Sequence, residues 1–372
     1  MRSRIKILLA LSLPVQWLLL SWAAARPEWV EQWYSRGLYP WLSGFFRFLY
    51  GWIPFSVGDL LYFALGLLAL WYLVRYGYRI RTHFWAFLRD VLAVLAVLHL
   101  TFYLLWGLNY FRQPLSAPLG LDESYTEAEL LALSGELVQE ANALQAHLAG
   151  DTVSPVRLPY SRRDILLKTE AAYELLSEGH ALFRYEQPSL KASLFSTLLS
   201  YMGYGGYLNP FTGEAQVNDR LPIFQFPAVC GHEVGHQLGY SAENETNFIG
   251  YLATREHPDP YFRYSAATFA LSYCLAEVNR RDSLARKELT RAINPGVRAN
   301  YAEVKEFWEH YQNPLEPVFK ALFNRYLEVN RQKDGIASYN RIVSLLVAYR
   351  RKEGVAGTGP DREKALQLVT GN

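Results

Sequence analysis

Two histidines, four positions apart, enclose a glutamate in the segment 231–236, whose sequence is GHEVGH. On an α-helix, residues four positions apart lie on one face, so the imidazoles of His232 and His236 can reach a single metal ion. Glu233 adjoins the first histidine, where its carboxylate can accept a proton from a metal-activated water. The pattern therefore predicts one Zn²⁺ per chain, with His232 and His236 as ligands and Glu233 as the general base. Two surface histidines on an ordinary helix would show the same spacing, and these ligand types also suit manganese or iron.

A third protein ligand is expected shortly after the second histidine. In metzincins this ligand is a histidine six positions further on, but here that position is Ala242, which excludes the class. Glu243 and Glu245 compete for the role within the next predicted helix. Glu245 shares an apolar stripe with Phe248 and Leu252, whereas Glu243 lies about 200° around the helix, in the first turn, where an acid suits the helix dipole. Because an acid on a buried stripe needs a partner, Glu245 is predicted to be the third ligand.

The composition separates an apolar N-terminal part from a more polar remainder. Hydrophobic residues make up 51% of the 372 residues and charged residues only 19%, and the apolar ones concentrate in the N-terminal third. The net charge of +2, with no basic stripe after residue 110, excludes a nucleic-acid binder. Cys230 and Cys274 cannot form a disulfide framework and are predicted to be buried thiols, although an oxidising compartment would permit one bridge.

Three apolar runs, near residues 7–24, 55–74 and 84–106, are each long enough to cross a membrane as a helix. The first also resembles a cleavable signal peptide, but its length and the two later runs favour a retained span. Arginines concentrate between the second and third runs, and the positive-inside rule places that loop in the cytoplasm. The sequence thus predicts a multi-pass protein of the cytoplasmic (inner) membrane with its N-terminus inside. Residues 1–109 would contact the lipid bilayer, and residues 110–372 would be extracytoplasmic.

The part that follows the membrane region is predicted to be mostly helical. Residues 107–122, with Pro114, Pro118 and Gly120, are typical of a linker. Thr126 and Glu129 form a capping-box pattern at the start of a helix that ends near Gly150. The other predicted elements are a helix over 161–183, short strands near 192–201 and 214–218, helices from 260 to about 352, and a flexible tail over 354–372.

Several segments beyond the HExxH pattern are similar to those of one known family. They are residues 106–110 (WGLNY), 206–215 (GYLNPFTGEA), 245–248 (ETNF), 263–265 (RYS) and 334–339 (DGIASY). The chain therefore resembles, over nearly its whole length, a domain-of-unknown-function family of three-span bacterial membrane proteins with gluzincin-like metallopeptidase features. The resemblance implies a zincin-like fold and membership of a peptidase clan, but no particular substrate. Cys230, Gly231 and Gly235 depart from it, since bulkier or more helix-favouring residues are usual around the motif.

Four polar residues are candidates for contacts with a substrate. The segment before the HExxH helix resembles the edge strand over which gluzincins lay an extended substrate, so Glu214 and Asn218 are candidates to line that cleft. Ordinary turn or surface roles are the alternative for both. Tyr339 shares a predicted helical stripe with apolar residues, and its hydroxyl could donate to a tetrahedral oxyanion, with a buried core tyrosine as the alternative. Tyr264 is a similar candidate for substrate binding.

Together these features predict an α-helical membrane anchor of three spans plus an α+β, mostly helical, zincin-like metallopeptidase domain. The predicted activity is hydrolysis of peptide bonds in a peptide or protein substrate by metal-activated water, and the sequence favours no oligomeric state. Two alternatives stay open: a zinc amidase acting on a cell-wall or small modified peptide, and a non-catalytic membrane scaffold with a structural metal site. Glu233 argues against the scaffold, because a structural site needs no base and fills all four positions with protein ligands.

Overall fold

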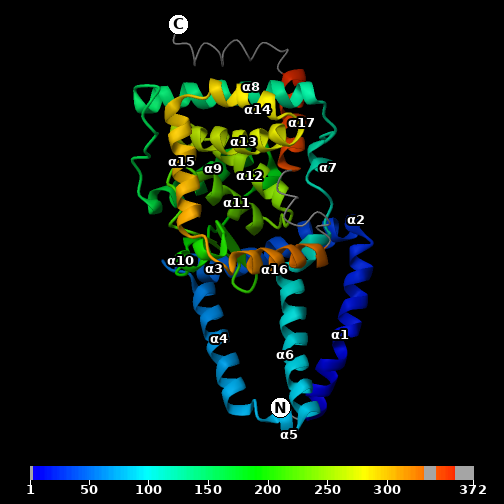
Figure 1. The fold of residues 1–372 in the computed structure, drawn as a ribbon. Coiled ribbons are helices and arrows are strands. Elements are labelled where there is room, and N and C mark those ends of the chain that lie inside the picture. The colour runs from blue at the N-terminus through cyan, green and yellow to red at the C-terminus, as the bar shows by residue number, and fades with distance from the viewer. Residues whose placement is uncertain (1–2, 331–340, 357–372) are drawn as a thin grey trace.

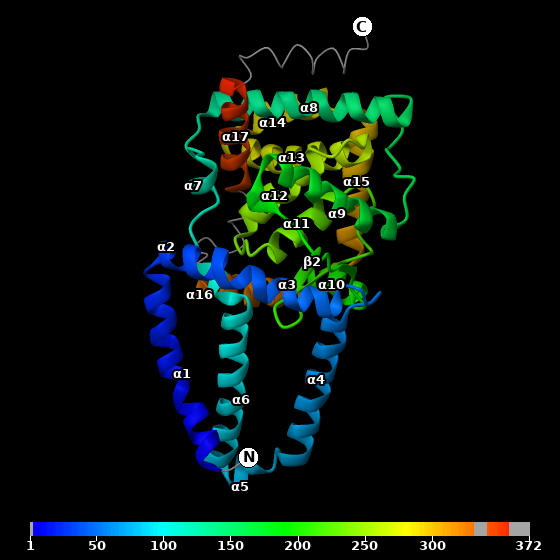
Figure 2. The ribbon, with the colours of Figure 1, turned by 180° about the vertical axis from the view of Figure 1, so that it is seen from behind.

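The computed structural model describes residues 3–330 and 341–356, which form two tiers joined by a layer of helices (Figure 1). The lower tier holds α1 (Ser3–Ala24), α4 (Val57–Tyr76) and α6 (Phe84–Leu105), each long and apolar enough to cross a membrane. The three predicted apolar runs are thus confirmed as helices. The short helix α5 (Arg79–Thr82) joins α4 to α6 at the end farthest from the upper tier, beside the N-terminus (Figure 2).

Polar contacts hold α1 against α6. The side chain of Gln16 donates to the carbonyl oxygen of Ala96 at 3.2 Å, and its amide oxygen lies 2.8 Å from Nδ1 of His99. Nearer the N-terminus, Lys6 donates to Asp90 at 2.8 Å. Such interhelical hydrogen bonds contribute to helix association in a bilayer, where the hydrophobic effect gives no preference for helix over lipid. Both views show α4 standing apart from this pair (Figures 1 and 2).

A layer of helices lies across the ends of the three apolar helices and connects the two tiers. It contains α2 (Pro27–Trp29), the π-helical η1 (Val30–Leu38), α3 (Tyr39–Tyr50) and, from much later in the chain, α16 (Glu316–Val329). Trp41 and Trp52 are 82% and 79% exposed there, as aromatic residues at a membrane–water interface tend to be. Asp59, in the first turn of α4, is fully buried and accepts from the backbone N–H of Leu194 at 2.7 Å, which ties α4 to the upper tier.

A small sheet sits just above this layer. Its strands are β1 (Leu190–Ala192), β2 (Gly206–Asn209) and β3 (Glu214–Val217), in the order β1-β3-β2, with β1 parallel and β2 antiparallel to β3. The strand predicted near 214–218 is confirmed. The strand predicted over 192–201 is wrong for most of its length, because Ser196–Met202 form helix α10. Its buried residues are spaced at helical intervals of three and four, which a short apolar run does not distinguish from a strand.

The upper tier is a bundle of helices around one apolar core, so the described chain is mostly helical with a minor sheet, as predicted. Its elements are α7 (Ser116–Leu119), α8 (Glu127–Ala149), α9 (Arg162–Gly179), η3 (Ala181–Phe183), α11 (Phe226–Gln237), α12 (Glu243–Arg255), α13 (Pro260–Arg281), α14 (Ser283–Ala292), α15 (Pro295–His310) and α17 (Ile342–Ala356). The short helix η2 (Gly107–Phe111), which follows α6, packs against η1 in the layer below. The capping box of Thr126 and Glu129 is confirmed at the start of α8. Cys230 and Cys274 are both buried and free, as expected of two core thiols.

Helices α11 and α12 approach each other more closely than ordinary side chains allow. A Cβ atom placed on Gly250 of α12 would lie 2.7 Å from the backbone nitrogen of His232 and 2.9 Å from the carbonyl oxygen of Ala228. On α11, a Cβ atom on Gly231 would lie 3.0 Å from the Cα atom of Gly250. Glycine therefore sits where the two backbones touch, because any larger residue would push the helices apart.

Candidate metal centre

The close approach of α11 and α12 brings two histidines and two glutamates together. His232 and His236 extend from one face of α11, and their Nε2 atoms lie 3.3 and 3.7 Å from the same Oε2 atom of Glu243, the first residue of α12. Glu233 lies beside them, with candidate ligand atoms of His232, Glu233 and His236 all within 4.8 Å of one another. All four side chains are buried.

Hydrogen bonds on the far side of each imidazole orient both rings toward Glu243. Nδ1 of His236 lies 2.8 Å from the carbonyl oxygen of Tyr240, which can only accept, so this nitrogen carries a proton. Nδ1 of His232 lies 2.8 Å from Oδ1 of Asn247, one turn after Glu243 on α12. In a neutral imidazole with a protonated Nδ1, the Nε2 lone pair is free to bind a metal, and histidines that bind metals usually donate their other ring N–H to such an acceptor.

Two buried carboxylate oxygens at the centre have no hydrogen-bond partner among the described residues. Neither Oε2 of Glu233 nor Oε2 of Glu243 accepts a well-formed hydrogen bond from the described residues, although buried carboxylate oxygens nearly always do. Two imidazole nitrogens and one carboxylate oxygen converge from Glu243, His232 and His236, with a second carboxylate alongside. The cluster could thus hold a metal ion.

The two carboxyls of the cluster have pKa values shifted in opposite directions. Burial raises the pKa of the Glu233 carboxyl, which makes it the more basic of the two. Burial acts in the same direction on Glu243, but the imidazoles of His236 and His232 outweigh it and hold the pKa of that carboxyl well below its usual range. Burial opposes a charge on His236, yet Glu243 raises the pKa of this histidine to about 9. Negative charge is therefore concentrated on the oxygen that faces both imidazoles.

Glu245, the predicted third ligand, is not among the residues that the structure brings together at the cluster. Its Oε1 accepts from the backbone N–H of Leu115 at 2.8 Å, and burial raises the pKa of its carboxyl to about 7. Helix α12 is buried on all sides from Glu245 to Thr254, so an apolar face does not mark the side toward the metal centre. Gly250 and the i, i+4 pair of Glu243 and Asn247 mark that side instead, since they share the face that meets α11.

The three candidates for substrate contacts that the structure describes make contacts within the protein and do not line the cavity at the cluster. Glu214 is fully buried and forms an ion pair with Lys191 at 2.5 Å. Asn218 is also fully buried and donates to the hydroxyl of Ser200 at 2.9 Å. The hydroxyl of Tyr264 donates to Asn300 at 2.8 Å within the core. Tyr339 lies outside the described residues.

A cavity of about 1130 Å³ opens onto the metal-binding cluster. Sequence reasoning missed its walls, which come from segments far apart in the chain: α4 and α6 of the lower tier, the strand β2, and α13, α15 and α16. Gly206, the first residue of β2, is so close to the centre that a Cβ atom there would lie 2.6 Å from Oε1 of Glu233. The cavity thus has an edge strand directly beside a carboxylate that lacks a partner.

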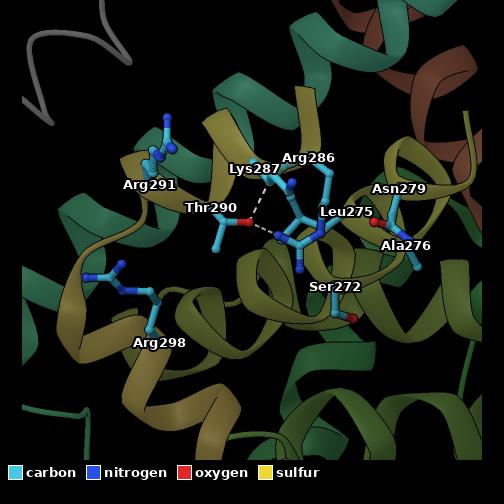
Figure 3. Close-up of a pocket in the computed structure, with 9 residues that line it drawn as sticks. All are labelled: Ser272, Leu275, Ala276, Asn279, Arg286, Lys287, Thr290, Arg291 and Arg298. Carbon is cyan, nitrogen blue, oxygen red and sulfur yellow. Dashed lines mark hydrogen bonds between the residues drawn. The ribbon is translucent and has the colours of Figure 1, made fainter. Parts of the chain in front are cut away.

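A second cavity, of about 620 Å³, has a different chemistry. It lies between α13, α14 and α15, and Figure 3 shows the basic side chains of Arg286, Lys287, Arg291 and Arg298 around it. No acidic residue or histidine is among its lining residues, so it offers neither carboxylates nor imidazoles to a divalent cation. The candidate centre for metal-dependent chemistry is therefore the cavity at α11 and α12.

One family of known proteins matches this chain. The family described as "Protein of unknown function (DUF3810)" matches residues 34–347, which include the histidine–glutamate cluster, α4 and α6. The chain belongs to this family. The helices α4 and α6 and the histidine–glutamate cluster thus all lie within the range that the family shares. No curated protein matches the chain. No solved structure matches it either.

A measurement of metal affinity tests whether Glu243 or Glu245 is the third ligand. We expect Glu243→Gln to weaken Zn²⁺ binding by at least about 100-fold, because a charged ligand oxygen is replaced by a neutral amide and even outer-shell partners contribute 10- to 100-fold. Glu245→Gln is the matched control, since it changes a buried acid on the same helix that accepts from Leu115 instead. Chelator-competition titrations of the full-length protein give both affinities. Loss of binding in Glu245→Gln alone would contradict the geometry.

Proposed function

We propose that this protein is a membrane-anchored, zinc-dependent peptidase in which Glu233 is the general base. The observation that carries the proposal is the convergence of His232, His236 and Glu243 on one point, with the unpartnered carboxylate of Glu233 beside it at the end of a large cavity. Two imidazoles and one carboxylate are the ligand set of gluzincin-type catalytic zinc sites, and zinc suits this mixture of donors.

Each residue of the cluster would have its own role in hydrolysis. A zinc ion held by His232, His236 and Glu243 would supply a water of lowered pKa and a positive charge near the substrate carbonyl. Glu233 would accept the proton of the attacking water and deliver it to the nitrogen of the leaving amine. Tyr240 and Asn247 would fix the two imidazole rings through their Nδ1 atoms, so that the ligand atoms are preorganised.

The position of β2 favours a peptide over other amide substrates. This strand lies at the edge of the sheet, paired on one side only, and lines the cavity beside Glu233. An extended peptide could add to its free edge through backbone hydrogen bonds, which would carry a peptide bond past the general base. The edge strand next to an HExxH helix also supports a zincin-like fold. A purely structural metal site explains neither the cavity nor the partnerless oxygen of Glu233.

Replacement of Glu233 tests the catalytic claim. We expect Glu233→Gln to lower peptide cleavage by roughly 10²–10⁴-fold, the usual contribution of a general base, while one zinc per chain is retained. Glu245→Gln is the matched control, because it neutralises a buried acid that does not face the cluster, and it should keep parental activity. The measurement is peptide-library cleavage and metal content of the full chain in lipid nanodiscs. If Glu233→Gln cleaved at the parental rate, or if the parent with bound zinc cleaved no peptide, the proposal would be overturned.

We also propose that the upper tier lies on the extracytoplasmic side of a bacterial inner membrane. Arg75, Arg79, Arg81 and Arg89 lie around α5, at the end of the lower tier farthest from the cluster. Positively charged loops are retained on the cytoplasmic side, so the opposite end, with the upper tier, would face outward.

Reporter fusions test this orientation. An alkaline phosphatase fused at the C-terminus should be active, because the enzyme requires an extracytoplasmic location, and the same enzyme fused after Arg81 should be inactive. Phosphatase activity in cells, normalised to the amount of fusion protein, is the measurement. The reverse pattern would place the cluster in the cytoplasm.

A further inference from the structure

The cavity at the metal-binding cluster continues along a helix long enough to span a membrane. Tyr62, Phe63, Gly66, Leu67 and Leu70 of α4 all line it, and their spacing places them on one face of that helix. Between the first and last of them, α4 rises about 12 Å. Phe102 and Trp106, at the end of α6, form part of the opposite wall. The cavity thus extends from the cluster into the tier that the membrane would surround.

This part of the cavity is open at the side. Phe63, Leu67 and Leu70 line it and yet are 56%, 51% and 59% exposed. In both ribbon views α4 stands apart from α6, while α1 packs against α6 on its other side (Figures 1 and 2). Because apolar side chains line this opening, the surroundings that suit it are hydrocarbon rather than water. A molecule dissolved in the bilayer could enter between α4 and α6.

The polarity of the cavity changes along its length. His232, Glu233, His236 and Glu243 are at its upper end and Lys320 of α16 also lines it, whereas the α4 wall is aromatic and aliphatic. Gly66 widens that wall, since no atom lies within 4 Å of where its Cβ would be. A ligand that fits this gradient has a polar, cleavable group next to a long apolar chain.

We propose that the substrate is a peptide that carries a fatty acyl chain, with the chain held along α4 and the adjoining peptide segment at the cluster. The proposal rests on the peptidase function proposed above and names its substrate class. The acyl chain would enter from the bilayer between α4 and α6. The peptide would leave the bilayer at the level of β2, where it can pair with the edge of the sheet.

An acyl chain fits this opening better than a transmembrane helix of a substrate protein. A helix with its side chains is about 10–12 Å wide and would have to unwind before a peptide bond could reach β2. Unwinding within hydrocarbon leaves backbone N–H and C=O groups without partners, which is costly. An alkyl chain has no hydrogen bonds to lose and follows a narrow apolar wall.

Photo-crosslinking of a palmitoylated peptide tests this proposal without requiring turnover. The probe carries a diazirine in the middle of its acyl chain and is added to the full-length Glu233→Gln protein in nanodiscs. We expect mass spectrometry to find labels on the inner face of α4, residues 62–70. Gly66→Trp should lower this labelling about tenfold or more, because the indole would occupy the space of several methylene groups. Leu70→Trp, on the same face, should act in the same direction.

Leu68→Trp is the matched control. Leu68 is 59% exposed, does not line the cavity, and lies about 200° around α4 from Gly66, so its replacement should leave the labelling within about twofold. All variants must keep the parental melting temperature and zinc content. Labels spread over the outer face of α4, or labelling that Gly66→Trp and Leu70→Trp leave unchanged, would overturn the proposal. Stronger labelling by an unacylated transmembrane peptide would also overturn it.

Cleavage assays with protein that keeps Glu233 separate this proposal from the peptidase function. We expect Gly66→Trp to lower the rate of cleavage of the acylated peptide relative to that of the same peptide without its chain. Cleavage of both peptides without the expected labelling would overturn the acyl-chain proposal alone. The expected labelling without cleavage of either peptide would overturn the peptidase function alone and leave α4 as a binding surface for acyl chains.

Discussion

The contact between α11 and α12 through glycine is the constraint on which the histidine–glutamate cluster depends. With Gly231 and Gly250 at the point of contact, the two backbones come close enough for a glutamate at the start of α12 to reach imidazoles on α11. The same approach lets Asn247 reach the far side of His232. A glycine weakens the interior of a helix by about 1 kcal/mol, so the residues that depart from the usual motif make sense as a requirement of this packing.

The long apolar helices of the lower tier and the cluster form one connected structure. The indole of Trp106, which ends α6, donates to the carbonyl oxygen of His236 at 3.1 Å. Tyr39, at the start of α3, donates to the carbonyl oxygen of Gln237 at 2.8 Å. The end of α11 is therefore held by groups from the lower tier and from the layer below the sheet, although the sequence suggested a division near residue 109. This connection explains how a cavity can have ionisable groups at one end and membrane-facing walls at the other.

Local signals in the sequence predicted the parts of the structure that local interactions determine. The apolar runs, the capping box at Thr126 and the spacing of His232 and His236 each depend on residues within a few turns of one another, and the structure shows them where they were expected. The choice between Glu243 and Glu245 depended on which side of α12 meets α11, and a helix buried on all sides gives no amphipathic signal. The cavity walls join α4 to segments far later in the chain, which no local pattern reveals.

The position of a bound zinc ion is the most direct test of this account. Crystals of the full-length protein grown with Zn²⁺ would give an anomalous difference map at the zinc absorption edge. The account predicts one peak per chain, about 2.0–2.2 Å from Nε2 of His232, Nε2 of His236 and an oxygen of Glu243, with Glu233 near it but not ligating. A peak coordinated by Glu245, or stoichiometric zinc bound away from α11 and α12, would contradict it.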